Sequence, residues 1–130
     1  MKVDILAIGA HPDDVELSCA GTLAKEIAAG KKVAIIDLTQ GELGTRGSVA
    51  VRVQEADKAA ALLGVHARYN AGFSDGFFTN DRKHQEALIA YIRLLQPEVV
   101  LCNATEDRHP DHGRAAKLVT DSCFLSGLVK

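Results

Sequence analysis

The chain has 130 residues, of which 47% are hydrophobic and 25% are charged, and its formal net charge is -2. This length and composition predict one globular domain over residues 1–130 and exclude a disordered or fibrous protein. No basic stretch is dense enough to neutralise phosphates, which argues against nucleic acid as a partner. The three cysteines lie far apart and no apolar run approaches the roughly 18 residues of a membrane span, so we expect a cytoplasmic protein without a membrane partner.

Short apolar runs alternate with amphipathic segments along the whole chain. The apolar runs predict buried strands at residues 3–9, 32–38, 65–71 and 98–103. Apolar residues at spacings of three and four predict helices at residues 15–29, 48–63, 81–95 and 111–124. In the first helix this pattern turns Leu17 and Leu23 inward, and in the second it does the same for Val51 and Ala56. The third strand is polar enough to lie near a sheet edge.

Strands that alternate with helices of this length indicate βαβ units and right-handed crossovers. We therefore expect an α/β fold, a Rossmann-like doubly wound three-layer sandwich with helices on both faces of a mostly parallel sheet. The common doubly wound strand order is 3-2-1-4. In that order the loops after the first and fourth strands flank the switch point, where such folds bind ligands.

Two dense clusters of histidine and aspartate follow the first and the last predicted strand. They are GAHPDD at residues 9–14 and DRHPDH at residues 107–112. A single histidine is more often a satisfied polar residue than a ligand, and paired acids at a helix start often reflect the helix dipole alone. Brought together in one crevice, the two clusters would be costly to bury without a cation. We therefore expect a metal site, with Zn²⁺ the best match to these ligands, although Fe²⁺ accepts the same set.

The residues of the two clusters divide into metal ligands and proton-transfer groups. The side chains of Asp13 and Asp14 diverge, so one would bind the metal and the other would act as general base. His109 and His112 are three residues apart, so one would be a ligand and the other a proton donor. Asp111 would orient the histidine that does not bind. Together these roles describe a hydrolase that attacks a carbonyl group.

A ten-residue glycine-rich loop at residues 39–48 follows the second strand. Its length in a small domain indicates a role at a site, with a plain mobile connection as the alternative. Arg52 follows this loop. It either belongs to the same site or forms an exposed ion pair with Glu55 on the second helix.

These segments resemble the LmbE-like (PIG-L) family of zinc-dependent N-acetylglucosamine deacetylases. The resemblance rests on HPDD at 11–14, Glu16, GTL at 21–23, GELGTRG at 41–47, Arg52, Glu55, DG at 75–76 and DRHPDH at 107–112. Within the family, the sequence of these segments is most similar to the bacillithiol biosynthesis deacetylases, which act on N-acetylglucosaminyl-malate. Family members usually continue well past residue 130, so the resemblance also implies that a C-terminal portion is lacking.

The resemblance implies a role for each matching residue of the two clusters. It implies that His11, Asp14 and His112 bind zinc. Asp13 would be the general base that later returns the proton to the leaving amine, and His109, supported by Asp111, would stabilise the oxyanion.

The resemblance also implies a small-molecule glycoconjugate substrate, and a homo-oligomer where the full family domain is present. Glu42, Arg52 and Asp75 match positions used around the sugar. Arg46 and Arg108 flank the expected mouth of the site, where they would meet the malate carboxylates or simply lie in solvent.

Two other functions compete with a deacetylase. A nucleotide-binding module would suit the fold, but the first strand–helix turn lacks G-x-G-x-x-G and its two aspartates would repel a pyrophosphate. A non-catalytic, truncated remnant of the family is the second competing function.

Overall fold

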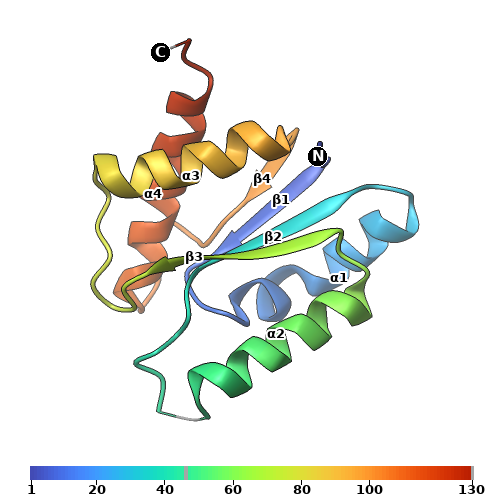
Figure 1. Ribbon diagram of the computed structural model, residues 1–130, viewed down its shortest axis with the longest axis horizontal. Coiled ribbons are helices and arrows are strands. Elements are labelled where there is room, and N and C mark those ends of the chain that lie inside the picture. Colours follow the sequence, from blue (N-terminus) through green and yellow to red (C-terminus); the bar gives the residue numbers. More distant parts are fainter. Residues whose placement is uncertain (46, 130) are drawn as a thin grey trace.

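The computed structural model describes residues 1–45 and 47–129, which form a four-stranded sheet between two layers of helices (Figure 1). In chain order the elements are β1 (Ile5–Gly9), α1 (Asp14–Ala28), β2 (Val33–Thr39), α2 (Val49–Leu63), β3 (Ala67–Phe73), α3 (Arg82–Leu95), β4 (Val99–Leu101) and α4 (Pro110–Ser126). All strand pairs are parallel and the order is β3-β2-β1-β4. The predicted α/β fold and its strand order are therefore confirmed. Over the two described ranges, no helix is both long and apolar enough to cross a membrane.

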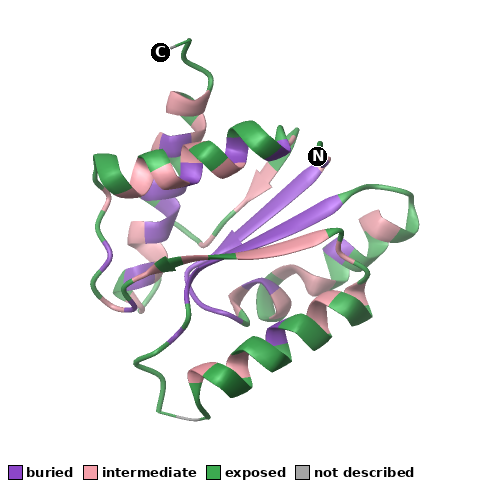
Figure 2. Ribbon diagram, in the orientation of Figure 1, coloured by how far each residue is buried: buried purple, intermediate pink, exposed green. Residues whose placement is uncertain are grey.

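The two central strands carry the core, because each is buried on both faces (Figure 2). Side chains alternate along a strand, so β1 serves both layers. Leu6 and Ile8 pack in the cluster that contains the inward side chains of α3 and α4. Ile5 and Ala7 pack with α1 on the other face. The outer strands β3 and β4 are less buried, as the polar sequence of the third strand predicted.

Local signals in the sequence set several helix ends. Ser48 caps α2 by accepting a hydrogen bond from the Val51 amide, and Asp81 caps α3 in the same way from the His84 amide. Gly64 ends α2 in the left-handed conformation, with φ of 78°. These ends lie within two residues of the predicted ones.

The predicted faces of the first two helices are right for Leu23 and Ala56 and wrong for Leu17 and Val51. Leu17 is 82% exposed, and Val15 fills the core together with Leu23. Residues two positions apart on a helix do not share a face, so the burial of Val15 turns Leu17 to solvent. In α2, Val51 is 43% exposed and Ala56 is the buried residue of the helix. This helix lies beside α1 and the edge strand β3, so most of its surface faces solvent (Figure 2).

A buried ion-pair network joins β3 to β2 and α1. The Arg68 guanidinium donates to both carboxylate oxygens of Asp37, at 2.8 and 2.9 Å, and to Glu16 at 3.0 Å. The side chains of Arg68 and Asp37 are only 6% and 4% exposed. Burial raises the pKa of Asp37, and the Arg68 guanidinium acts against that rise. Glu16 belongs to the first turn of α1, so this network also holds the helix that follows the first histidine–aspartate cluster.

We expect Arg68→Met to lower the free energy of unfolding by about 3–5 kcal/mol, because it leaves the Asp37 carboxylate buried without its cation. Urea unfolding followed by circular dichroism measures the change. The double variant Arg68→Met/Asp37→Leu should recover much of the loss, since both charges are then gone. A single variant as stable as the unaltered chain would contradict this account.

Candidate metal centre

The site forms where the carboxyl ends of β1, β2 and β4 meet. The residue after β1, Ala10, is held from both sides. Its amide donates to the Asn103 side chain beyond β4, at 2.9 Å, and its carbonyl accepts from the Thr39 hydroxyl at the end of β2, also at 2.9 Å. The loop 10–13 is therefore fixed at the switch point of the sheet, as the strand order predicted.

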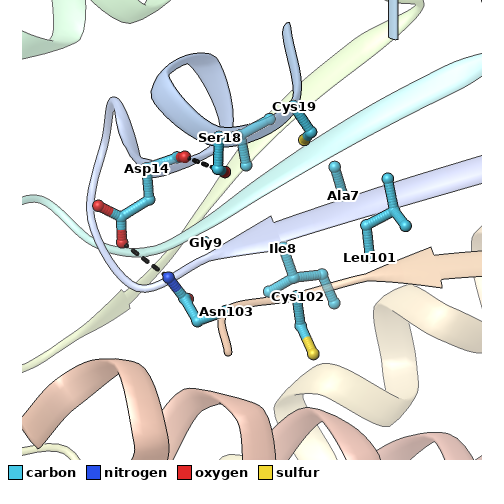
Figure 3. A pocket seen from close by; sticks show the side chains of 10 residues that line it. Ala7, Ile8, Gly9, Asp14, Ser18, Cys19, Leu101, Cys102 and Asn103 are labelled. Atoms are coloured by element: carbon cyan, nitrogen blue, oxygen red, sulfur yellow. Dashed lines mark hydrogen bonds between the residues drawn. The ribbon is translucent and has the colours of Figure 1, made fainter. Parts of the chain in front are cut away.

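Asp14 is oriented by Asn103, which follows β4, and by the backbone of the loop that precedes α1. Figure 3 shows the Asn103 amide directed at the Asp14 carboxylate, at 3.3 Å. The same carboxylate oxygen accepts from the His11 backbone amide at 3.0 Å. Behind it lies a cavity of about 210 Å³ lined by Ser18, Cys19 and Cys102, among others. Asn103 was not among the predicted site residues, because its only signal in the sequence is a polar side chain at a strand end near the second cluster.

The ligand atoms of His11, Asp14 and His112 lie within 4.8 Å of one another. The Asp14 Oδ2 atom is 3.5 Å from His11 Nδ1 and 3.2 Å from His112 Nε2. His11 is 8% exposed, whereas Asp14 and His112 are half-buried. Two imidazoles and one carboxylate that converge on one point suit a zinc ion and leave a position open for water.

The outward nitrogens of both imidazoles face carboxylates. His112 Nδ1 lies 2.9 Å from Asp107, and His11 Nε2 lies 2.8 Å from Asp111 and 3.0 Å from Asp75. An imidazole ligand usually donates its remaining N–H to such a partner, which fixes its tautomer and its orientation. The surroundings of the three candidate ligands therefore fit a bound metal as well as the ligands do.

The electrostatics of the site favour a positive charge at its centre. Burial lowers the pKa of His11, but hydrogen bonds to Asp14 and Asp111 outweigh this and raise it to about 9. Burial raises the pKa of Asp14, but its hydrogen bonds with His11 hold it below its ordinary value. In the metal-free protein a protonated imidazole thus balances the surrounding carboxylates. A metal cation would take over that role, with neutral His11 as its ligand.

Asp13 differs from Asp14 in its backbone conformation and in the exposure of its side chain. Its φ of 100° places it in the left-handed region, and its side chain is 55% exposed. It is the N-cap residue of α1, but within the described chain its side chain makes no capping bond. Asp13 instead lines the crevice together with His11 and His109. Burial raises the pKa of Asp13, and the Arg52 guanidinium at 3.6 Å opposes that rise.

Arg52 reaches the site through the glycine-rich loop. Its guanidinium donates to the carbonyls of Pro12, at 2.9 Å, and Gly41, at 3.1 Å. Gly41 has φ of 64°, and a Cβ there would collide with the guanidinium, so glycine is needed for this approach. The exposed ion pair with Glu55 is not among the contacts of the described residues. Arg52 instead holds the backbone on one side of Asp13.

His109 lies over the same crevice. Its ring centroid is 4.7 Å from that of His11 and 5.0 Å from that of His112. Its Nδ1 atom accepts from the Asp111 backbone amide at 3.1 Å, which leaves the neutral ring with its proton on Nε2. We expected the Asp111 carboxylate to support His109, but the structure places that carboxylate on His11. His109 is therefore oriented by the first turn of α4.

The five residues expected around the substrate differ in where they lie. Asp75 is buried against His11, and its second oxygen accepts from the Leu43 amide at 2.8 Å. The Glu42 carboxylate accepts from the Asp75 amide at 2.9 Å, so these two loops are tied reciprocally. Arg108 is exposed on the loop before α4. Arg46 lies outside the described residues.

The crevice opens into two adjoining cavities. One, of about 300 Å³, is lined by His11, Asp13, Leu43, Asp75 and His109, among others. The other, of about 360 Å³, lies over the glycine-rich loop and the start of α2. Asp13, Gly44 and Arg52 line both. The pair is large enough for a sugar and a second group bonded to it.

Known proteins match the chain over nearly its whole length. The family model described as GlcNAc-PI de-N-acetylase (PIG-L) matches residues 6–123. The diacetylchitobiose deacetylase of Thermococcus kodakarensis is 30% identical over 134 residues, which cover 95% of this chain and 50% of that protein. The chain spans about half the length of the curated relatives it matches.

Solved structures share the fold. The crystal structure of the conserved protein TT1542 from Thermus thermophilus has a TM-score of 0.94 and 41% identity, covering 98% of this chain and 58% of that one. The GalB hydratase from Pseudomonas putida KT2440, which acts on 4-carboxy-2-hydroxymuconate, has a TM-score of 0.83 and 26% identity. This match covers 96% of the present chain and 57% of the hydratase chain.

We expect the affinity for zinc to rise between about pH 7 and pH 9, by up to about tenfold per pH unit, because His11 must lose a proton to bind metal. Folding raises the His11 pKa from 6.5 to about 9. Its protonation therefore stabilises the metal-free fold fully below pH 6.5, and this stabilisation is lost as the pH rises through about 9. Chelator competition measures the affinity, and urea unfolding measures the stability.

The exposed His66 offers a matched control, because it lies away from the two clusters. His66→Gln should keep the same pH dependence of zinc affinity. An affinity that stays constant from pH 7 to pH 9 would contradict the assignment of His11 as a ligand.

Proposed function

The chain belongs to the GlcNAc-PI de-N-acetylase (PIG-L) family, and from this we propose that it removes the acetyl group from an N-acetylglucosamine conjugate. The observation that carries the proposal is the convergence of His11, Asp14 and His112, with Asp13 and His109 on the rim of the same crevice. His11, Asp14 and His112 would hold the metal ion. The ligand set suits Zn²⁺, and Fe²⁺ accepts it as well.

When bound, the metal supplies a Lewis acid that polarises the amide carbonyl and makes water more acidic. The protein supplies the proton transfers. The Asp13 carboxylate faces the crevice. It takes one proton from the water while the water oxygen attacks the acetyl carbonyl carbon. The C–N bond then breaks, and Asp13 returns the proton to the leaving nitrogen. The second proton of the water leaves when the acetic acid ionises, so the products are acetate, the free amine and one proton, with no covalent enzyme intermediate.

His109 would stabilise the negative oxygen that forms during the attack. The hydrogen bond from the Asp111 amide to Nδ1 places the ring proton on Nε2, so the ring is a donor. His109 and Asp13 line the same cavity, which allows both to meet one acetamide group. A donor held in place before the reaction stabilises the transition state without the cost of reorienting.

We propose N-acetylglucosaminyl-malate, the bacillithiol precursor, as the particular substrate. The support is the similarity of residues 41–47, 52, 55 and 75–76 to the bacillithiol deacetylases. Arg108 would meet the malate carboxylates at the mouth, with Arg46 in the same predicted role. We also propose a cytoplasmic location, because all three cysteines are free thiols, as in a reducing compartment. The homo-oligomer remains a prediction.

A hydratase is the second candidate function, because the GalB hydratase is 26% identical over nearly all of this chain. A non-catalytic remnant and a nucleotide-binding module also compete with the deacetylase. Release of acetate distinguishes the deacetylase from all three. Zinc binding without any turnover would favour the remnant, and nucleotide binding independent of metal would favour the module.

We expect Asp13→Asn to lower the rate of acetate release by at least about 100-fold, because the amide cannot accept the proton. Asparagine tolerates the left-handed backbone at this position, so the fold should be kept. Zinc content should stay at the level of the unaltered chain, whereas His11→Ala and His112→Ala should lose the metal.

The matched control is Asp57→Asn, an exposed carboxylate on α2 that should leave the rate unchanged. Full activity of Asp13→Asn would refute the assignment of the base. Unchanged zinc content in both histidine variants would refute the metal site.

We expect the chain to release acetate faster from N-acetylglucosaminyl-malate than from the corresponding inositol conjugate or from diacetylchitobiose. The reason is the pairing of the malate carboxylates with Arg108. An assay of released acetate across the three compounds, repeated with Arg108→Gln, measures the preference. Turnover of diacetylchitobiose with none of the malate conjugate would overturn the proposed substrate but not the deacetylase.

A further inference from the structure

Arg114 contacts two segments that are brought together only by the fold. It lies on α4, and its Nη2 atom is 3.0 Å from Asp111 Oδ1. Its Nη1 atom donates to the carbonyls of Gly76, at 3.1 Å, and Phe78, at 3.0 Å. The guanidinium also lies over the Phe78 ring, 5.5 Å from its centroid. No motif in the sequence singled out this residue.

Arg114 matters to the metal centre through its contact with Asp111, whose side chain is 0% exposed. Its Oδ2 atom lies 2.8 Å from His11 Nε2 and accepts from the Gly76 amide at 3.0 Å. Its Oδ1 atom accepts no well-directed hydrogen bond from the described residues. The nearby Arg114 guanidinium therefore acts on that oxygen mainly by its charge. A buried carboxylate that loses such a cation is strongly destabilised.

Arg114 also sets the second carboxylate on His11. Its bonds to Gly76 and Phe78 hold the turn that begins at Asp75, and the Asp75 Oδ1 atom is 3.0 Å from His11 Nε2. Both carboxylates that face the outward nitrogen of His11 thus depend on one guanidinium: Asp111 by its charge and Asp75 through the backbone of the turn.

We propose that Arg114 is a positioning residue that orients the metal ligand His11 through Asp111 and Asp75. The inference rests on the proposed metal site, in which His11 binds through its inward nitrogen Nδ1. With both carboxylates in place, the proton of neutral His11 stays on Nε2 and Nδ1 faces Asp14 and the metal. Without Arg114, Asp111 is a buried charge lacking its cation and the turn at Asp75 is released, so the ring loses its fixed orientation.

An ordinary helix ion pair does not describe this residue. Exposed pairs three residues apart on a helix contribute little and touch nothing else. The Arg114 side chain is 34% exposed, but its partner Asp111 is fully buried, and its other bonds go to a loop 36 to 38 positions earlier in the sequence. Lys117 gives the contrast on the same helix. It is 70% exposed and pairs only along the helix, with Asp121 at 3.1 Å.

The experiment measures zinc affinity of the full chain by chelator competition for Arg114→Gln, Arg114→Lys and the control Lys117→Gln. Loss of a partner in the outer shell of a metal site typically weakens binding by about 10- to 100-fold. We expect that loss for Arg114→Gln and no change for Lys117→Gln. The visible spectrum of the Co²⁺-loaded protein should also change in Arg114→Gln at saturating metal, because the ligand orientation differs. A purely structural role would leave that spectrum unchanged.

Circular dichroism of the metal-free variants separates misfolding from altered binding. If Arg114→Gln does not fold, Arg114→Lys decides, because lysine keeps the charge but cannot hold Asp111 and both carbonyls at once. Zinc binding several-fold weaker than in the unaltered chain would support the proposal. Unaltered affinity and an unaltered Co²⁺ spectrum in a folded variant would overturn it. Loss of zinc in His11→Ala together with full binding in Arg114→Gln would leave the metal site standing and remove only the positioning role.

Discussion

The imidazole of His11 is the group on which the rest of the site depends. It is buried after β1, with Asp14 near one ring nitrogen and Asp75 and Asp111 near the other. These carboxylates come from three separate segments, and they would repel one another without a positive charge between them. A proton or a metal ion at His11 would therefore hold together the loop after β3 and the first turns of α1 and α4. The repulsion among these carboxylates thus explains both why the crevice needs a positive charge to assemble and why we expect it to bind a cation.

Arginines anchor the loops around this centre by binding backbone carbonyls. Arg52 holds Pro12 and Gly41, which fixes the chain beside the left-handed Asp13. Arg114 holds Gly76 and Phe78, and Arg68 ties β3 to the first turn of α1 through Glu16. A guanidinium suits this role because its planar donors bind several acceptors at once and its charge persists when it is partly buried. Gly41 and Gly44 leave the room that Arg52 requires.

The different orientations of the adjacent aspartates follow from the backbone. Asp14 is helical and turns inward to the imidazoles, where hydrogen bonds favour its charged form. Asp13, in the left-handed conformation, turns the other way and remains accessible. Backbone strain of this kind costs on the order of 1–3 kcal/mol and persists where the surroundings enforce it. The bonds of Ala10 to β2 and β4 and of Pro12 to Arg52 supply that enforcement.

The sequence by itself determined the elements, the strand order and the place of the site. Apolar periodicity and capping residues act over a few positions, so they could be read along the chain, and the strand order then placed both clusters at one switch point. Local patterns failed where packing decided, as at Leu17, which faces solvent because α1 buries the side of Val15. Only the tertiary structure showed that Asp111 and Asp75 face His11, that Asn103 contacts Asp14 and that Arg114 contacts Asp111. These contacts join residues up to 100 positions apart, and side-chain direction at such distances depends on how the elements pack rather than on spacing in the sequence.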